Sequence, residues 1–201
     1  MDSEFELGKK VYVEAIEFAK TAHEGQFRTF SMAPYFTHPV RVATLVMKFK
    51  QSHAIDDLVV AALLHDTVED TDTTLRSIEL RFNPRVAGLV AELTSDKDKQ
   101  KQMGKSAYLS EKVLEMSSWA LVIKLCDRLD NVMDFIYAPD KFVARYSQET
   151  ENILNSLYLH RDSLSDTHKT IMAKIESALV LGKRSRDDTK ENVGGGAEGR
   201  A

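Results

Sequence analysis

The chain has 201 residues and a formal net charge of −4, and 43% of its residues are hydrophobic. This length fits one domain of ordinary size, and the hydrophobic share is enough for a full core. The acidic balance, with a sequence pI of about 5.9, argues against a large basic surface for duplex nucleic acid.

The cysteine count and the hydropathy of the chain indicate the cellular compartment in which we expect the protein. Cys126 is the single cysteine, so no intramolecular disulfide can form, which is typical of a reducing compartment. The first residues, MDSEFE, lack the basic and apolar regions of a secretory signal, and no apolar run approaches the roughly 20 residues that span a bilayer. We therefore predict a cytoplasmic protein without a membrane segment.

Hydrophobic periodicity predicts helices from the start of the chain. Apolar residues at helical spacing indicate a helix over residues 4–23, and Gly25 is its expected end. Residues 24–37 have no clean period and are predicted to form a loop. Pro39 suits the first turn of a helix that should run to about Lys50.

The rest of the chain also reads as helical, and we expect no strand. Residues 55–64 are almost entirely apolar and predict the most buried helix. The strongly charged residues 96–105 are typical of a solvated connection or, alternatively, of a basic flap over an anionic substrate. The fold class that follows is all-α. The remaining predicted helices cover about residues 75–82, capped by Thr73 or Thr74, and about 86–93, 119–136, 139–160 and 165–182.

The composition changes near the C-terminus. From residue 184 onward the chain holds almost no large apolar side chain and is rich in charge and glycine. Such a segment has little to bury, so we predict one domain over residues 1–183 and a disordered tail over 184–201.

The stretch around which the chemistry is organised is residues 63–71, where an apolar helix turns polar within one step. His65 and Asp66 are adjacent, and Glu69 and Asp70 follow four residues later, so all four side chains can gather at one end of a helix. An adjacent His–Asp pair offers an imidazole and a carboxylate to one divalent metal ion.

Two further residues are candidates for the same ion. Asp127 lies in a second apolar helix, where a lone carboxylate is costly to bury, and His38 precedes Pro39 at the mouth of a third. A His–Asp pair standing alone is often only a hydrogen-bonded pair. Two imidazoles and two carboxylates together, however, suit a borderline ion such as Mn²⁺, Fe²⁺ or Zn²⁺.

The other polar residues near these ligands suggest roles in catalysis and binding. Glu69 is our candidate for the general acid or base acting on the attacking water, and Asp70 for orienting that water or the leaving group. Asn131 lies four residues after Asp127, on the same side of its helix, and could bond a ribose or a base. Arg28, in the first loop, could stack on a base or pair with a phosphate.

Two further acids lie near Asp127 and Asn131, and four other histidines have no partner pattern. We predict that Asp130 and Asp134 are solvent-exposed. The four histidines, which we expect to be structural or on the surface, are His23, His53, His160 and His168.

At this point four ordered motifs together resemble the HD-domain hydrolases of the RelA/SpoT-homologue family. The motifs are residues 22–28 (AHEGQFR), 34–43 (PYFTHPVRVA), 61–71 (AALLHDTVEDT) and 123–131 (IKLCDRLDN). The resemblance spans roughly residues 5–160 and leaves no room for a synthetase domain, so the chain looks like a stand-alone small alarmone hydrolase.

The resemblance implies a single HD-domain helical bundle with the metal site between its helices. It implies an Mn²⁺ ion, one per chain, at His38, His65, Asp66 and Asp127, catalytic acids at Glu69 and Asp70, and nucleotide contacts from Arg28 and Asn131. The implied reaction removes pyrophosphate from the 3′ position of guanosine tetra- or pentaphosphate and leaves GDP or GTP.

Three departures from the family pattern fall on substrate-facing positions. Thr29 replaces the usual lysine after Arg28, the loop from Gln26 to Pro34 is a residue longer and lacks a glycine, and Met133 replaces an arginine. The alternatives are therefore an adenosine 3′-pyrophosphate alarmone, the 2′-phosphate of NADPH, or another nucleotide of the HD class. A non-enzymatic alternative is an antitoxin-like binding module, against which the intact Glu69 speaks.

Overall fold

The computed structural model describes the backbone of residues 2–194 and the side chains of residues 10–182. Within this part, every regular element is a helix, and the strand-like pairing is limited to an isolated bridge between Phe27 and Pro34. The all-α prediction is confirmed. The elements are α1 (Asp2–Ala22), α2 (Thr37–Phe49), α3 (Ile55–Leu64), α4 (Thr67–Asp70), α5 (Leu75–Arg81), α6 (Pro84–Leu93), α7 (Lys97–Met103), α8 (Lys105–Glu115), α9 (Ser118–Met133), the 3₁₀ helix η1 (Asp134–Tyr137), α10 (Asp140–His160) and α11 (Asp166–Gly194).

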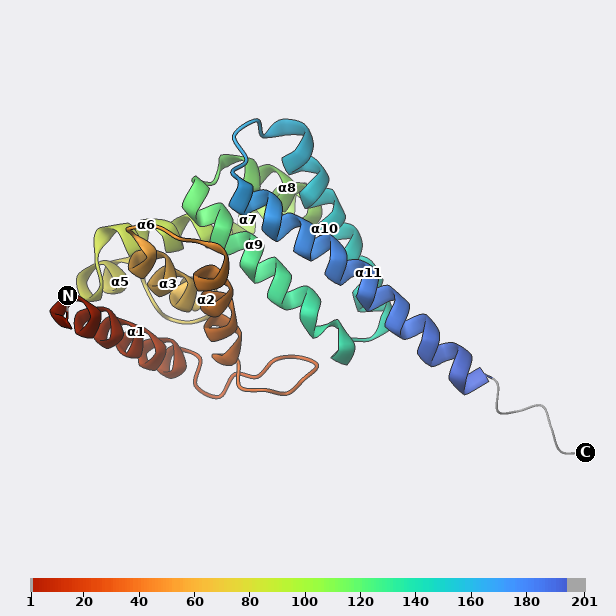
Figure 1. The fold of residues 1–201 in the computed structure, drawn as a ribbon, viewed down its shortest axis with the longest axis horizontal. Coiled ribbons are helices and arrows are strands. Elements are labelled where there is room, and N and C mark those ends of the chain that lie inside the picture. Colours follow the sequence, from red (N-terminus) through yellow and green to blue (C-terminus); the bar gives the residue numbers. More distant parts are fainter. Residues whose placement is uncertain (1, 195–201) are drawn as a thin grey trace, which may run out of the picture.

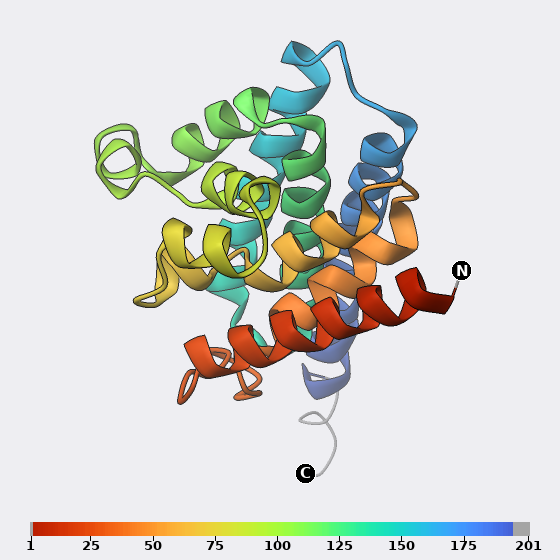
Figure 2. The ribbon, with the colours of Figure 1, turned by 90° about the vertical axis from the view of Figure 1, so that its left-hand side faces the viewer.

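Two helices form the centre of the bundle. After its first turn, which carries Asp56 and Asp57, α3 is apolar on all sides, and residues 58–64 are all buried because α1, α2 and α6 pack around it. α9 lies between α2 and α11 and also contacts α3 and α6. Figures 1 and 2 show the central position of α9, with α10 and α11 on one side and the first six helices on the other. The two helices therefore bring residues far apart in the sequence close together.

Local signals explain where several helices begin. The side chain of Thr74 accepts a hydrogen bond from Ser77 N and completes a capping box, as predicted for α5. Asn83 caps α6, and Pro84 occupies its first turn, where a missing N–H costs nothing. Ser117 caps α9 by accepting a hydrogen bond from the backbone of Ala120.

The segment that we expected to be a solvated connection, residues 96–105, is mostly helical. Asp96 accepts hydrogen bonds from two backbone N–H groups at the start of α7, which favours a helix despite the high charge. Gly104, at a φ of +80°, then separates α7 from α8. We did not predict α8, which packs against α7 and α10.

Other boundaries differ from the sequence-based ones. The polar stretch after α3 is not the end of one helix: His65 ends α3, and Asp66 begins the short α4. The last helix continues past Gly182 to Gly194. Of the predicted disordered tail, 184–201, residues 184–194 have helical backbone as part of α11. Residues 195–201 lie outside the described part, so their disorder stays a prediction.

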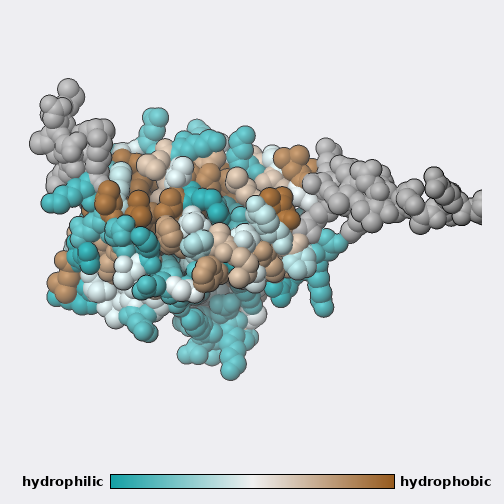
Figure 3. Space-filling model, turned by 90° about the horizontal axis from the view of Figure 1, so that it is seen from below, coloured by the Kyte–Doolittle hydropathy of each residue, from teal (hydrophilic) through white to brown (hydrophobic). Residues whose placement is uncertain are grey.

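The loop of residues 24–36 lies on one face of the bundle. On that face, apolar side chains are scattered among polar ones (Figure 3). Among the described residues, none of the helices is both long and apolar enough to cross a membrane.

Candidate metal centre and substrate cavity

Three buried side chains meet where α2, α3 and α9 approach one another. One ligand atom from each of His38, His65 and Asp127 lies within 4.8 Å of the other two. Nε2 of His38 is 3.2 Å from Oδ1 of Asp127, and Nε2 of His65 is 3.9 Å from the same oxygen. The predicted convergence of these residues is therefore present in the fold.

Asp66 completes this group from the break between α3 and α4. Its Oδ2 lies 3.1 Å from Nε2 of His65 and 3.6 Å from Nε2 of His38. The side chain is 20% exposed, against 1% and 2% for the two histidines, so it forms the solvent side of the group. We call these four residues the metal-ligand group.

Hydrogen bonds set the orientation of both imidazole rings. Nδ1 of His38 lies 2.6 Å from Oδ2 of Asp130, and Nδ1 of His65 lies 2.8 Å from the carbonyl oxygen of Ala62. Both partners only accept hydrogen bonds, so each Nδ1 carries the proton. In the neutral ring the lone pair is then on Nε2, the atom that faces the carboxylates.

The group fits a divalent cation. Nε2 of His65 is buried and has no hydrogen-bond partner among the described residues, although Oδ2 of Asp66 lies 3.1 Å away. A buried imidazole nitrogen without a partner is costly, and a cation would satisfy it. Two imidazoles and two carboxylates are also a donor set that a borderline ion accepts.

In the metal-ligand group, the charge on each side chain changes the pKa of its neighbours. Burial opposes protonation of His38, but hydrogen bonds to Asp127 and Asp130 outweigh it and raise its pKa to about 9. Burial likewise opposes ionisation of Asp127, but Lys124 and the two histidines hold its pKa well below the usual range. Without a cation, protons on the imidazoles therefore supply the positive charge that the carboxylates require.

Side chains around the group hold its two carboxylates. Lys124 donates a hydrogen bond of 2.8 Å to Oδ2 of Asp127, and Asn131 donates one of 2.6 Å to Oδ1. Tyr35 donates one of 2.8 Å to Oδ2 of Asp66. Burial and the neighbouring carboxylates raise the pKa of Tyr35, which keeps its hydroxyl protonated and able to donate.

The two proposed catalytic acids lie on α4, directly after Asp66. Oε2 of Glu69 accepts a hydrogen bond of 2.8 Å from the backbone N–H of Ser95, and Lys97 donates to the Glu69 carbonyl. Asp70 Oδ2 lies 3.5 Å from the Tyr35 hydroxyl. Burial and the charges of Asp66 and Glu69 raise the pKa of Asp70.

The two proposed substrate contacts lie together. Arg28 donates a hydrogen bond of 2.8 Å to Oδ1 of Asn131 and further bonds to Asp134. Both residues line a cavity of about 350 Å³ beside the metal-ligand group. Tyr35 and Asn131 belong to both places, since each also bonds a carboxylate of the metal-ligand group. The other side chains that line this substrate cavity are Thr29, Phe30, Ser31, Asp134, Phe135, Ala138, Phe142, Arg145 and Tyr146.

The expectation of exposure was wrong for Asp130 and incomplete for Asp134. Asp130 is only 2% exposed, because its carboxylate is held between His38 and the guanidinium of Arg41. Asp134 is partly buried and accepts hydrogen bonds from both Arg28 and Arg41. The i+3 spacing of Asp130 from Asp127 places both on the buried side of α9, a signal that was available in the sequence.

Sequence reasoning also missed Tyr35 and Lys124. Both stand inside the motifs quoted above, and Lys124 precedes Asp127 by three residues, which is a helical neighbour spacing. Tyr35 lies in an irregular loop, so no periodic pattern could have placed it beside Asp66. Of the histidines without a pattern, His23 is buried against the Tyr35 ring, with centroids 4.7 Å apart, and His168 is buried and bonds the Ser118 carbonyl.

Comparisons with known proteins agree with the fold and the site. The family model described as "HD domain" matches residues 15–164. The Homo sapiens protein named guanosine-3′,5′-bis(diphosphate) 3′-pyrophosphohydrolase MESH1 is 42% identical over 125 residues, which cover 61% of this chain and 68% of that protein. Its Drosophila melanogaster counterpart is 37% identical over 124 residues, with the same two coverages.

A solved structure gives the same assignment. It is described as a metazoan orthologue of SpoT that hydrolyses ppGpp, and it matches with a TM-score of 0.69 and 28% identity over 88% of this chain and 95% of that one. The resemblance inferred from the four motifs is confirmed. Because the family model spans most of the chain, and the metal-ligand group forms where the family motifs meet, the chain belongs to the HD-domain family of metal-dependent hydrolases.

Proposed function

We propose that the chain is a Mn²⁺-dependent hydrolase that removes the 3′-pyrophosphate of guanosine tetra- or pentaphosphate and leaves GDP or GTP. The observation that carries the proposal is the position of the substrate cavity, which shares Tyr35 and Asn131 with the surroundings of the metal-ligand group. Relatives named as 3′-pyrophosphohydrolases of guanosine 3′,5′-bis(diphosphate) support the choice of substrate.

The metal-ligand group would hold one ion through Nε2 of His38 and His65 and the carboxylates of Asp66 and Asp127. When bound, such an ion activates water for attack on phosphorus and polarises a phosphoryl oxygen. Mn²⁺ is our choice because imidazole and carboxylate donors together suit it, and Fe²⁺ and Zn²⁺ are the alternatives.

Glu69 and Asp70 would handle the proton and the water. The Ser95 N–H holds one oxygen of the Glu69 carboxylate, and we assign the other oxygen to the attacking water. Asp70, whose pKa is raised and which faces Tyr35, would orient that water or the leaving group. As the water oxygen forms its bond to phosphorus, the proton of the water would pass to Glu69. The bond between the 3′ oxygen and phosphorus would break, and the 3′ oxygen would leave with the electron pair of that bond and take up a proton from solvent or from Asp70.

Arg28 and Asn131 would hold the nucleoside in the substrate cavity. A guanidinium stacks on any purine face and pairs with phosphate, so Arg28 supplies affinity without choosing the base. The aromatic rings of Phe30, Phe142 and Tyr146 offer further apolar surface in the same cavity. Hydrogen bonds to the base edge must make the choice, and Thr29 and Ser31 are placed to provide them.

Product analysis with a panel of nucleotides tests the proposal. Purified protein with Mn²⁺ is incubated with the guanosine and adenosine 3′,5′-bis(diphosphates) and with NADPH, and the products are separated by chromatography. GDP and pyrophosphate from the guanosine compound are expected. Activity confined to the adenosine compound would overturn the base preference, and inorganic phosphate from NADPH alone would overturn both the substrate and the bond cleaved.

Two further assignments accompany this proposal. We place the catalytic domain at residues 1–183, of which the family model covers 15–164. We place the reaction in the cytoplasm, because Cys126 is free and buried and suits a reducing compartment.

A further inference from the structure

One peptide group connects the Glu69 carboxylate with a lysine on a different helix. The N–H of Ser95 donates to Oε2 of Glu69, and the carbonyl of Thr94 accepts a hydrogen bond from Nζ of Lys112. The Thr94 carbonyl and the Ser95 N–H belong to the same peptide bond. In a planar trans peptide these two groups point in opposite directions, so Lys112 and Glu69 lie on opposite sides of it.

This arrangement lets a cation act on Glu69 from a distance. An ammonium that bonds the carbonyl polarises the peptide, which makes its N–H a stronger donor to the carboxylate on the other side. The Lys112 bond also prevents rotation of the peptide plane, and that plane sets the direction of the Ser95 N–H. Burial and the Lys124 charge lower the pKa of Lys112 to about 8, so the ammonium form still dominates at neutral pH.

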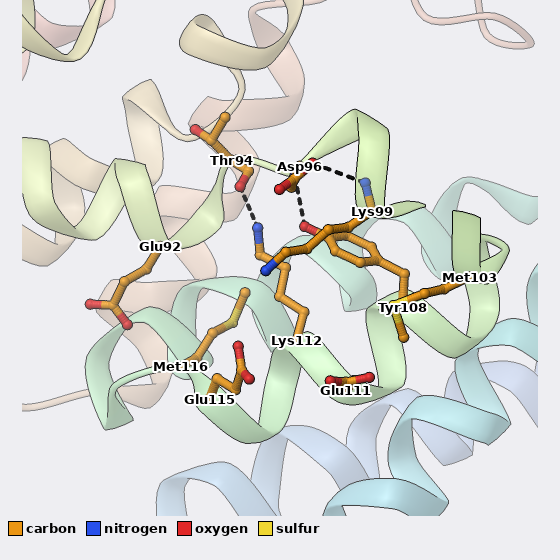
Figure 4. A pocket seen from close by; sticks show the side chains of 10 residues that line it. All are labelled: Glu92, Thr94, Asp96, Lys99, Met103, Tyr108, Glu111, Lys112, Glu115 and Met116. Atoms are coloured by element: carbon orange, nitrogen blue, oxygen red, sulfur yellow. Dashed lines mark hydrogen bonds between the residues drawn. The ribbon is translucent and has the colours of Figure 1, made fainter. Parts of the chain in front are cut away.

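The backbone of Asp96, one residue further along, is also held by a side chain of α8. The backbone N–H of Asp96 donates a hydrogen bond of 2.7 Å to the hydroxyl of Tyr108, which lies on α8 with Lys112. Figure 4 shows both contacts from the side of a cavity of about 310 Å³ that α6, α7 and α8 enclose. Thus α8 fixes the segment 94–96 from one side, and Glu69 contacts it from the other.

We propose that Lys112 is a positioning residue for Glu69, acting through the peptide group between Thr94 and Ser95. The inference rests on the proposed catalytic role of Glu69. Lys112 itself lines a cavity that does not include the metal-ligand group, so it needs no contact with substrate, and this peptide is its hydrogen-bonded link to Glu69.

The test is the steady-state kinetics of Lys112→Met, Lys112→Arg and Glu69→Gln with the guanosine 3′,5′-bis(diphosphate) substrate. Lys112→Met should lower kcat about tenfold, the size expected when a supporting hydrogen bond of a catalytic group is lost. KM and metal content should stay nearly unchanged. Lys112→Arg should restore most of kcat, because the cavity leaves room for the larger side chain and a guanidinium also donates to the carbonyl.

The double variant distinguishes positioning from a general loss of structure. In the Glu69→Gln background, Lys112→Met should have almost no further effect, because the group that it positions is already gone. An equal loss of kcat in both backgrounds would overturn the proposal. Lys141→Met, which removes an exposed lysine on α10, controls for the loss of one positive charge.

The outcomes separate this proposal from the proposed function. Full activity of Lys112→Met with an inactive Glu69→Gln variant would overturn the positioning role alone, whereas full activity of Glu69→Gln would overturn both. If Lys112→Met lowers the melting temperature strongly, Tyr108→Phe provides a second measurement. It should lower kcat less than Lys112→Met, and a rise in KM alone would contradict the proposal.

Discussion

The metal-ligand group and the substrate cavity are neighbours but are built differently. The metal-ligand group draws its side chains from α2, α9 and the residues that follow α3, and its histidines and Asp127 are buried. The substrate cavity has one wall on α9, η1 and α10, and takes Arg28, Thr29, Phe30, Ser31 and Tyr35 from an irregular loop. The geometry of the first is set by helix packing, whereas the second can change with a few loop residues. Chemistry can therefore be retained while the substrate varies.

The largest effect should follow removal of a metal ligand. His65→Ala or Asp127→Ala should lower activity by at least about 10³-fold, because activation of water by the ion is worth several kcal/mol. Metal analysis should find about one ion per chain in the parent protein and much less in either variant. Full activity after exhaustive chelation would contradict the metal-dependent mechanism.

The second-largest effect is expected for Glu69→Gln, which tests whether Glu69 transfers a proton or binds the metal ion. Glu69→Gln should retain metal and melting temperature but lose turnover by roughly 10²–10⁴-fold, the usual contribution of general acid–base catalysis. Metal content and single-turnover rates provide the measurement. Loss of the ion in this variant would make Glu69 a ligand instead.

A change in the substrate cavity should have a different kinetic signature. Arg28→Ala should raise KM more than it lowers kcat, because stacking on a purine stabilises the bound ground state and the transition state alike. Arg28 also bonds Asn131, which in turn bonds Asp127, so the metal content of the variant is measured beside its kinetics and should stay near that of the parent protein. A variant with unchanged KM and low kcat would show that Arg28 acts in the catalytic step. The substrate cavity would then not be limited to binding, which contradicts the division of roles between the two regions.

The metal-free protein should lose stability as the pH rises, and the cause lies in the metal-ligand group. The pKa of His38 is raised from an ordinary 6.5 to about 9, so the folded protein keeps a proton that the unfolded chain releases in this window. This stabilisation is complete below pH 6.5 and is lost as the pH rises through about 9. Melting temperatures of metal-free protein should fall across this range.

Two controls accompany the melting curves. Saturating Mn²⁺ should flatten the pH dependence, because the ion replaces the proton between the imidazoles and carboxylates. His38→Gln should flatten it without metal. A metal-free melting temperature that rises between pH 6.5 and 9 would show that His38 is not protonated in the folded state.

The smallest effect is expected from a deletion at the C-terminus. Deleting residues 185–201 should leave activity and melting temperature nearly unchanged, because the composition of this segment offers little apolar surface to bury. Thermal melts and steady-state rates of the shortened chain are the measurement. A large drop in either would show that the segment docks on the domain.

The contrast between the two regions also explains which helices and site residues could be predicted from the sequence. Helical periodicity placed α3 and α9 correctly, because a helix that is apolar on all sides, or along a wide stripe, must be buried. Asp127 could then be recognised as a costly carboxylate inside α9. His38 and His65 follow from their positions at helix ends.

What could not be predicted depends on contacts between segments without a period. The loop that carries Tyr35 brings its hydroxyl to Asp66, and no spacing rule predicts that contact. The burial of Asp130 could have been inferred from its spacing on α9, but its pairing with Arg41 could not, because Arg41 lies on α2.

The helix α7 was missed because it has no buried residue, and α8 because its buried residues, Tyr108, Leu109 and Val113, stand among charged ones. The hydrogen bonds of Lys112 and Tyr108 to segment 94–96 join elements without a common period and could not be foreseen.

Hydrolysis in ¹⁸O-labelled water tests the central claim, that the metal-ligand group and Glu69 direct water at the 3′ phosphorus of a nucleotide held in the substrate cavity. Guanosine 3′,5′-bis(diphosphate) is turned over once with Mn²⁺, and both products are analysed by mass spectrometry. We predict one ¹⁸O atom in pyrophosphate and none in GDP, because attack at the 3′ phosphorus leaves the ribose oxygen unlabelled. Label in the nucleoside product, or release of inorganic phosphate in place of pyrophosphate, would contradict the account.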